Sequence, residues 1–133
     1  MIKSKLRDKV LKLRKSKSKK SINISPSNIY SYLKKKNYNL KIIGGYYPYN
    51  FEINTLNLFK DLEKKNYKIT LPKINDKAEM NFFYWSTKDP LQVNKFGIPE
   101  PISNIKKNPN ILLVPLVAFD KDFNRIGYGG GFY

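Results

Sequence analysis

The sequence predicts a single layered α/β domain with a largely parallel sheet over residues 1–133. Two observations support this prediction. Segments with an apolar residue at every third or fourth position alternate with short, continuous apolar runs, which is the order of helices and strands in α/β proteins. The chain has 133 residues, of which 41% are hydrophobic. That length is enough for one hydrophobic core but not for two independent ones.

The first predicted helix runs from about residue 2 to residue 15. Its apolar stripe consists of Ile2, Leu6, Val10 and Leu13. A neighbouring face carries three cations, Lys3, Arg7 and Arg14. On the pattern alone this is an amphipathic helix with a basic flank, followed by an exposed basic helix end or loop at residues 15–20.

Two further helices follow. Ser25-Pro26 begins one of them, because serine caps a helix and proline fits its first turn. The buried face of this helix consists of Ile29, Tyr30 and Leu33, and the segment KKKNYN at 34–39 ends it. Thr55 opens the next helix, which extends to about Lys65 with an apolar face of Leu56, Phe59 and Leu62.

Short apolar runs between the helices predict the strands. Residues 41–47 form a buried strand whose glycines permit close approach by a neighbour, and residues 67–72 form a strand stopped by proline. Residues 80–85 form another strand. The run ILLVPLVAF at 111–119 is the most hydrophobic in the chain and predicts a central buried strand. The segment FGIPEP at 96–101 is interpreted as a rigid linker rich in turns.

Composition excludes several kinds of chemistry. The chain has no cysteine and no histidine, so thiolate and imidazole ligands and imidazole bases are absent. No apolar run approaches the ~20 residues needed to span a bilayer, and the N-terminus lacks the apolar region of a secretory signal. We therefore expect a cytoplasmic protein without a membrane partner.

The net charge of +16 is uneven along the chain. Residues 1–20 hold eight lysines and two arginines against one aspartate, which gives +9 and leaves +7 for the rest. The chain has 23 lysines but three arginines, whereas nucleic-acid recognition favours the arginine fork. Solvated lysines are the favoured interpretation, and a nucleic-acid interface through residues 1–20 stays as the alternative.

Three candidate sites follow predicted strands, where ligands of α/β proteins bind. The segment RIGYGGGFY at 125–133 is either a flexible glycine-rich end or a nest of backbone amides for an anion. Glu52 lies among aromatic residues, which suits a flat nitrogen-rich ring, although an exposed carboxylate is commoner. Asp120 and Asp122 offer oxygens for Mg²⁺, but the stretch DKDFN is favoured as a plain turn.

Six segments together resemble the 5-formyltetrahydrofolate cyclo-ligase family. They occur in family order and are KSKLR at 3–7 with Arg14, YPYNFEINT at 47–55, Leu71-Pro72, MNF at 80–82, FGIPEP at 96–101 and VPLVAFDKDFNRIGYGGGFY at 114–133. The last is highly specific, and the resemblance covers essentially the whole chain. It implies an α/β/α cyclo-ligase-like fold that lacks its C-terminal part, since the family continues beyond the position of Tyr133.

The resemblance implies an enzyme dependent on ATP and Mg²⁺ that converts 5-formyltetrahydrofolate to 5,10-methenyltetrahydrofolate, releasing ADP and phosphate. In the family the formyl oxygen attacks the γ-phosphoryl group, and the second folate nitrogen then closes the ring. These steps require alignment of the substrates and neutralisation of phosphoryl charge, which need no histidine.

The resemblance also assigns site residues. It implies ATP binding by Lys3, Ser4, Lys5, Leu6, Arg7, Arg125, Ile126, Gly127, Tyr128, Gly129, Gly130, Gly131, Phe132 and Tyr133. It implies folate binding by Tyr47, Glu52 and Tyr128, with Glu52 at the pterin end. No metal ligand is assigned, because the aspartate that follows the glycine loop in the family has no counterpart here. We expect a monomer without nucleic acid, and a non-catalytic remnant of the enzyme is a second alternative.

Overall fold

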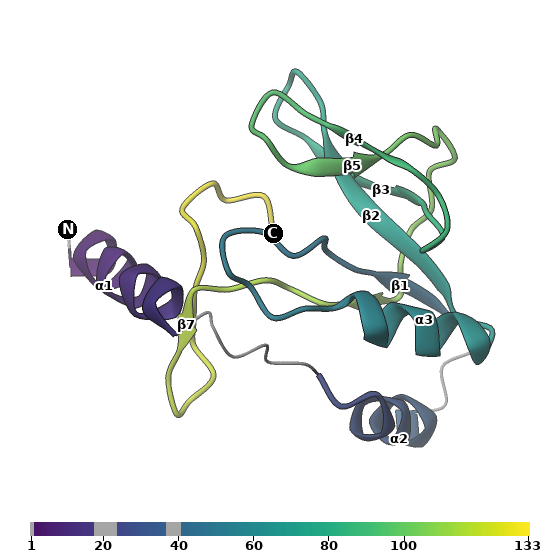
Figure 1. The fold of residues 1–133 in the computed structure, drawn as a ribbon, viewed down its shortest axis with the longest axis horizontal. Coiled ribbons are helices and arrows are strands. Elements are labelled where there is room, and N and C mark those ends of the chain that lie inside the picture. The colour runs from purple at the N-terminus through teal and green to yellow at the C-terminus, as the bar shows by residue number, and fades with distance from the viewer. Residues whose placement is uncertain (1, 18–23, 37–40) are drawn as a thin grey trace.

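The computed structural model describes residues 2–17, 24–36 and 41–133 (Figure 1). Its helices are α1 (Ile2–Ser16), α2 (Pro26–Lys36) and α3 (Leu56–Lys64). Its strands are β1 (Ile42–Gly44), β2 (Lys68–Ile74), β3 (Met80–Tyr84), β4 (Leu91–Val93), β5 (Pro99–Pro101), β6 (Ile111–Leu112), β7 (Ala118–Phe119) and β8 (Arg125–Ile126). The three predicted helices are confirmed, whereas the predicted loop at residues 18–20 and the helix end at 37–39 lie outside the described residues.

The main sheet has four strands in the order β3-β2-β1-β6. Strand β1 pairs in parallel with both β2 and β6, and β3 pairs antiparallel with β2. The predicted α/β class is therefore confirmed, with a mixed sheet in which three of the four strands are parallel. Two small hairpins, β4-β5 and β7-β8, lie outside this sheet.

The glycines at the end of β1 permit the close approach that the sequence predicts. A Cβ atom on Gly44 would lie 2.5 Å from Leu112 Cδ2 and 2.9 Å from Pro109 Cγ. A Cβ atom on Gly45 would lie 2.5 Å from the ring of Phe59, which is completely buried. Both positions leave no room for a side chain, because β6 and α3 pack directly onto the backbone.

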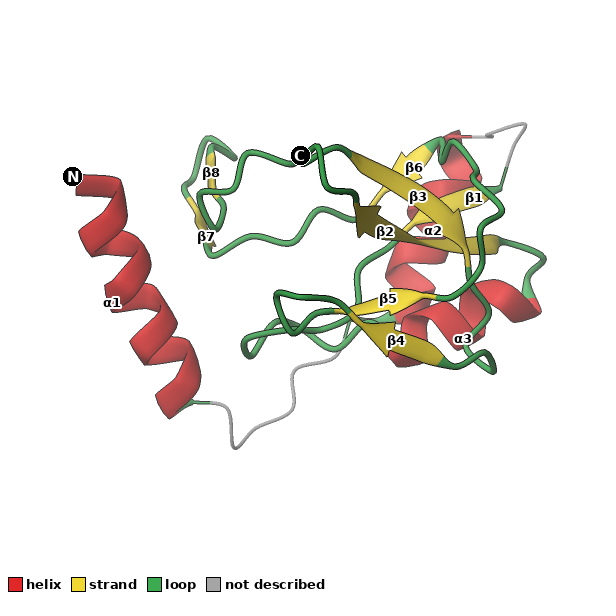
Figure 2. Cartoon of the chain, turned by 90° about the horizontal axis from the view of Figure 1, so that it is seen from above, coloured by secondary structure: helices red, strands yellow, loops and turns green. Residues whose placement is uncertain are grey.

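The hydrophobic core lies between the sheet and two helices. Helix α3 is the most strongly amphipathic of the three described helices, and it buries Leu58, Phe59 and Leu62. Leu33 of α2 joins them, together with strand residues that include Ile43, Ile69 and Leu71. Helices α2 and α3 lie on the same side of the sheet (Figures 1 and 2).

Helix α1 stands apart from the sheet at one end of the molecule (Figure 2). None of its residues is buried, and Leu6 and Leu13 of the predicted apolar stripe are 41% and 48% exposed. Consequently α1 does not supply a second helical layer over the sheet, as an α/β/α arrangement would require. The described helices also include none that is long and apolar enough to cross a membrane.

Two strand predictions are wrong in extent because of proline. The strand at 67–72 was predicted to stop at Pro72, but β2 continues to Ile74. Strand β2 pairs with β1 only as far as Thr70, so β3 is the only strand paired with β2 at Pro72. The N–H group that proline lacks is therefore not needed for a hydrogen bond between β2 and β1. The run 111–119 is no central buried strand: it divides around Pro115 into β6, at the end of the described sheet, and β7.

The segment 96–101 is only partly the predicted linker. Its first half is a turn in which Gly97 has a φ of +77° and Asn94 Oδ1 accepts hydrogen bonds from two backbone amides. Its second half is strand β5. The partner strand β4 lacks the alternation of apolar and polar residues that would have predicted it from the sequence. This hairpin lies beside β2 and forms one wall of the cleft described next.

Candidate functional site

A cleft of about 830 Å³ lies between α1, the β4-β5 hairpin and the C-terminal segment 125–133. Most of the residues assigned to ATP and folate line this one cleft. They are Lys3, Arg7, Tyr47, Glu52, Arg125, Ile126, Gly127, Tyr128, Gly129, Gly130, Gly131, Phe132 and Tyr133. The structure thus gathers residues from both ends of the chain around a common space.

Three assigned residues, Ser4, Lys5 and Leu6, do not line the cleft. Residues four apart share one face of a helix, so Lys3 and Arg7 point together while the three between them point elsewhere. Lys5 lies instead along a shallow groove on another face of α1, beside Lys9 and Lys12. The assignment of Ser4, Lys5 and Leu6 to ATP stays a prediction.

The C-terminal segment is held by the turn at 120–124. Asp120 Oδ1 accepts hydrogen bonds from the backbone amides of Asp122 and Asn124, each at 2.9 Å, which confirms the predicted turn. The Val117 amide donates to the Ile126 carbonyl at 2.8 Å and closes the β7-β8 hairpin. Beyond this hairpin the chain runs without regular structure along the cleft.

Glycine is required at two positions of this segment. Gly129 has a φ of +95° and Gly131 a φ of +70°, in the region that residues with a side chain rarely adopt. A Cβ atom on Gly129 would also lie 3.4 Å from the guanidinium of Arg7. The glycines thus allow the backbone to lie against α1 and the cations that it carries.

Two arginines dock α1 onto the C-terminal half of the chain. Arg7 Nε donates to the Gly127 carbonyl at 2.7 Å. Arg14 donates to the carbonyls of Leu116 and Val117 at 2.7 and 2.9 Å and to the Tyr128 hydroxyl at 2.9 Å. The basic face predicted from the spacing of Lys3, Arg7 and Arg14 is therefore directed at the cleft wall.

Glu52 is held in a loop between β1 and α3. Thr55, fully buried, donates its hydroxyl to the Tyr46 carbonyl, and the Tyr49 amide donates to Glu52 Oε1 at 2.8 Å. Asn50 and Phe51 have positive φ values of 53° and 60°, which turn the chain so that Glu52 faces the cleft. Glu52 Oε2 is buried and has no hydrogen-bond partner within the described residues.

Burial makes Glu52 a weak acid. Loss of hydration raises its pKa from 4.5 to about 7, while the Tyr49 amide, the charge of Arg14 and the Tyr128 hydroxyl each favour the ionised form. The carboxyl group is therefore partly protonated at neutral pH. A neutral carboxyl group can donate one hydrogen bond and accept another, which a carboxylate cannot.

Three tyrosines surround this carboxyl group. Burial and the charge of Glu52 raise the pKa of Tyr46 and of Tyr133 to about 12, and they raise the pKa of Tyr128 as well. These hydroxyls stay protonated at neutral pH and remain hydrogen-bond donors. The site thus combines an aromatic wall with polar groups whose protons are retained.

Sequence reasoning missed several residues of the cleft. Met80, Phe96 and Ile98 line it, although their motifs were quoted only as signs of the family. Tyr46 and Glu100 were also missed, and Glu100 is buried with its Oε2 accepting from the Ile74 amide at 3.1 Å. Phe96 and Glu100 both belong to the motif FGIPEP, but only the fold shows that they reach the cleft.

The described residues do not fit a protein-built Mg²⁺ site. Within ranges 2–17, 24–36 and 41–133 no three acidic side chains gather as metal ligands. Glu52 and Glu100 are the two carboxyl groups along the cleft, and Asp120 is engaged in its turn. Mg²⁺ prefers carboxylate oxygens in octahedral geometry.

Comparison with known proteins gives concordant matches. The model of the 5-formyltetrahydrofolate cyclo-ligase family matches residues 1–133. A 5-formyltetrahydrofolate cyclo-ligase of Haemophilus influenzae is 32% identical over 136 residues, covering 97% of this chain and 70% of that protein. A probable 5-formyltetrahydrofolate cyclo-ligase of Schizosaccharomyces pombe is 32% identical over 72 residues, covering 49% of this chain and 35% of that protein.

Two solved structures are similar in fold. The Aquifex aeolicus 5,10-methenyltetrahydrofolate synthetase superposes with a TM-score of 0.72 at 31% identity, covering 100% of this chain and 70% of that one. A 5,10-methenyltetrahydrofolate synthetase from Mycoplasma pneumoniae gives a TM-score of 0.69 at 22% identity, covering 100% of this chain and 75% of that one. At that lower identity the second match supports the fold alone.

Proposed function

Because the chain belongs to the 5-formyltetrahydrofolate cyclo-ligase family, we propose that it converts 5-formyltetrahydrofolate to 5,10-methenyltetrahydrofolate, with ATP giving ADP and phosphate. The observation that carries this proposal is the single cleft. Residues that the family resemblance assigns to ATP and residues that it assigns to folate line the same space of about 830 Å³. Reaction between the two substrates requires this proximity.

We assign the triphosphate to the side of the cleft formed by α1 and the C-terminal segment. Lys3, Arg7 and Arg125 bring three positive charges to this side. Gly129 and Gly131 let the backbone approach closely, so that amide groups can face the phosphates. Fixed cations and amides stabilise the charge that develops during phosphoryl transfer without needing an imidazole group.

We assign the pterin ring to the side of the cleft that contains Glu52. Tyr47, Tyr128 and Glu52 line this side. A pterin ring offers adjacent donors and acceptors at its edge and a flat face, which match a carboxyl group set among aromatic rings. The free Oε2 atom of Glu52 is available for this contact.

The proposed reaction has two chemical steps. The formyl oxygen attacks the γ-phosphorus of ATP, an O–P bond forms, and the bond to the β-γ bridging oxygen breaks to release ADP. The neighbouring folate nitrogen then attacks the formyl carbon, loses its proton, and closes the ring as the carbon–oxygen bond breaks and phosphate leaves. The cleft contributes alignment and charge neutralisation to both steps.

The direct test measures formation of 5,10-methenyltetrahydrofolate from 5-formyltetrahydrofolate and ATP, together with the binding of each substrate. Glu52→Gln is expected to weaken 5-formyltetrahydrofolate binding about tenfold, as loss of a hydrogen bond to a charged group does, and to leave ATP binding nearly unchanged. Gln matches the shape of Glu but cannot ionise.

The matched control is Glu79→Gln, an exposed carboxyl group in the β2-β3 turn that does not line the cleft. It should leave both affinities unchanged. Equal loss of ATP and folate binding in Glu52→Gln would contradict the assignment of Glu52. Salt-sensitive binding of RNA by a chain that binds neither ATP nor folate would instead favour the nucleic-acid alternative.

A further inference from the structure

Strand β2 has one edge that the main sheet leaves partly open. Its pairing with β1 ends at Thr70, whereas its pairing with β3 continues to Ile74. Backbone amides along such a strand point to alternate sides. The Asn75 amide donates to the Glu79 carbonyl, on the β3 side, so the Ile74 amide points to the open side. Pro72 has the same orientation but no N–H group. Among the described residues of β2 beyond Thr70, the Ile74 amide is therefore the one backbone donor that faces the open edge.

Glu100 of β5 supplies the acceptor for this donor. Its Oε2 atom accepts from the Ile74 amide at 3.1 Å, and its side chain is only 7% exposed. Beyond Thr70 no other strand of the described sheet pairs with this edge of β2. A buried amide without a partner is unfavourable. The carboxyl group of Glu100 thus takes the place of the carbonyl that a neighbouring strand would offer.

The same hydrogen bond attaches the β4-β5 hairpin to the main sheet. The two strands form a separate small sheet that lies beside β2. A two-stranded hairpin is only marginally stable by itself, so its position depends on what it is attached to. Lys73 Nζ also donates to the Ile102 carbonyl and to Asn104 Oδ1, but both contacts are exposed and 3.4 Å long. The hydrogen bond of Glu100 is the shorter and more buried attachment.

The hairpin carries an apolar wall of the cleft, formed by Phe96 and Ile98. Phe96 is 54% exposed despite its large apolar ring, so the ring is accessible to a ligand. Pro72 and Ile74 of β2 line the same cleft. A shift of the hairpin relative to β2 would therefore change the shape of the cleft at this wall.

We propose that Glu100 is a positioning residue of the folate site: its hydrogen bond to the Ile74 amide fixes the β4-β5 hairpin against β2 and so places the apolar wall. This role rests on the proposed function, because an apolar wall suits the uncharged rings of 5-formyltetrahydrofolate rather than a triphosphate. Two other roles predict different results. Glu100 could contact a ligand through its charge, or it could stabilise the fold without affecting the wall.

The first experiment needs no ligand and uses two variants that separate reach from charge. Glu100→Gln keeps the length of the side chain and an acceptor oxygen but loses the charge. Glu100→Asp keeps the charge but is one methylene shorter, so it no longer reaches the Ile74 amide. Hydrogen exchange of individual amides is followed by NMR in the 133-residue chain.

Glu100→Asp is expected to raise the exchange rate of the Ile74 amide about tenfold relative to that of the Gly45 amide. The Gly45 amide is the internal reference, because it donates to the Thr70 carbonyl within the sheet. In Glu100→Gln the ratio should stay within about threefold of its original value, since a neutral oxygen still accepts from the amide. Equal rises at both amides in Glu100→Asp, or an unchanged ratio, would overturn the proposal.

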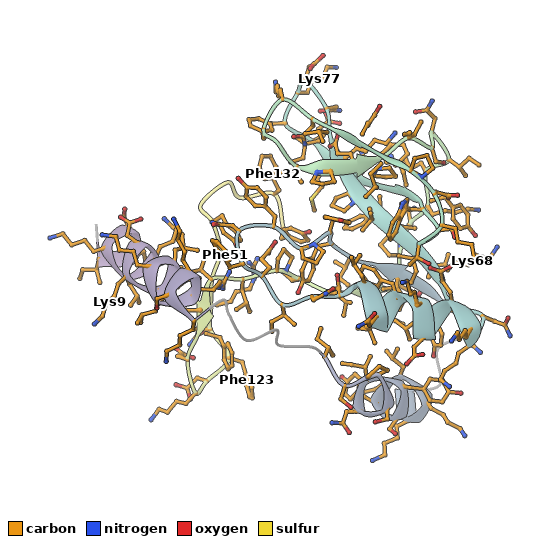
Figure 3. The ribbon with its side chains drawn as sticks, viewed as in Figure 1. Lys9, Phe51, Lys68, Lys77, Phe123 and Phe132 are labelled. Atoms are coloured by element: carbon orange, nitrogen blue, oxygen red, sulfur yellow. The ribbon has the colours of Figure 1, made fainter. Side chains whose placement is uncertain are left out.

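The matched control is Lys77→Gln, in the turn between β2 and β3. Lys77 is exposed and points away from the rest of the molecule at the outer end of these strands (Figure 3). Its substitution should leave the exchange ratio and both substrate affinities unchanged. A rise at Ile74 as large as that in Glu100→Asp would overturn the proposal, because the amide would then respond to any change near the end of the strand.

The second experiment measures the binding of 5-formyltetrahydrofolate and of ATP. Glu100→Asp is expected to weaken folate binding about tenfold, because a displaced wall covers less of the apolar surface of the ligand. ATP binding should change less, and Glu100→Gln should bind folate within about threefold of the unsubstituted chain. Equal losses for the two substrates would indicate a role in fold stability alone. Loss of folate binding in Glu100→Gln with retention in Glu100→Asp would indicate a charged contact, and either result overturns the proposal.

Failure of this proposal can be distinguished from failure of the proposed function. If the unsubstituted chain binds no folate, the proposed function fails, whereas exchange at Ile74 still decides whether Glu100 holds the hairpin. If folate binds equally well to the unsubstituted chain and to Glu100→Asp, the positioning role is wrong and the proposed function stands. Should Glu100→Asp not fold, weak folate binding by Glu100→Gln would still overturn the positioning role.

Discussion

At the scale of single residues, the position of Glu52 has an energetic cost that the cleft has to offset. The carboxyl group is largely removed from water, yet one of its oxygens has no partner among the described residues. Burial of an unsatisfied polar atom costs about 1–3 kcal/mol. Residues that reduce stability in this way are common at binding sites, where the missing partner belongs to the ligand.

The raised pKa of Glu52 predicts how stability depends on pH. The folded protein binds a proton more tightly than the unfolded chain, whose carboxyl group titrates near 4.5 against about 7 in the fold. The contribution of Glu52 to the free energy of unfolding is therefore complete below pH 4.5 and is lost as the pH rises through 7. Because Glu52 is partly exposed to solvent, we expect the free energy of unfolding to fall by roughly 2 kcal/mol as its contribution is lost.

The measurement is urea unfolding of the unsubstituted protein and of Glu52→Gln at a series of pH values. Taking the difference between the two cancels the other titrating groups. The difference should change across the window from 4.5 to 7 and become constant outside it. A constant difference throughout the window would show that Glu52 titrates normally in the fold.

At the scale of elements, close packing of β1 against α3 makes Gly45 sensitive to substitution. A methyl group there would lie 2.5 Å from Phe59 Cζ, and the ring is fully enclosed. We expect Gly45→Ala to lower the free energy of unfolding by about 1–3 kcal/mol, the usual cost of overfilling a packed core. Equilibrium urea unfolding measures this directly.

Gly97→Ala is the control for this substitution. A Cβ atom at Gly97 meets nothing within 4 Å, so its cost arises from the positive φ of +77° alone. That cost should be about 1 kcal/mol. A smaller loss for Gly45→Ala than for Gly97→Ala would mean that α3 moves freely relative to β1.

Elements with local signals could be predicted from the sequence, whereas those fixed by distant partners could not. The stripe of α3 and the proline at the start of α2 are local features, and both helices are confirmed. The run at 111–119 is the most hydrophobic in the chain but forms only short strands. Pro115 interrupts it, and β6 is an edge strand of the described sheet rather than a central one. Apolar content indicates burial but does not give strand length.

The same distinction applies to the site. The spacing of Lys3, Arg7 and Arg14 placed them on one helix face, but it could not show that Arg14 reaches Tyr128, which is 114 positions away. The family resemblance proposed Glu52 and the glycine segment, and these line the cleft. Glu100 lies in the motif FGIPEP, but nothing in that motif indicates that its carboxyl group is buried at the cleft.

At the scale of the whole molecule, the net charge of +16 couples stability to ionic strength. Positive charges repel one another in the compact state, and salt screens them over a Debye length of about 10 Å at 0.1 M. We expect sodium chloride between about 0.02 and 0.2 M to raise the free energy of unfolding. The same salt should weaken ATP binding, because it screens the attraction of the triphosphate to Lys3, Arg7 and Arg125.

Chemical denaturation and equilibrium binding, each repeated across the salt series, test these opposite trends. Stability and ATP affinity falling together with salt would show that specific ion pairs, rather than general repulsion, dominate the behaviour of the chain.

The hydrogen bond between Arg7 and Gly127 joins residues 120 positions apart. During synthesis α1 therefore leaves the ribosome well before the surface that it docks against. Arg7 and Arg14 of α1 therefore stay in solvent until residues 116–128 emerge. The core of α3, β1 and β2 can form before then, and the cleft is completed only when α1 docks.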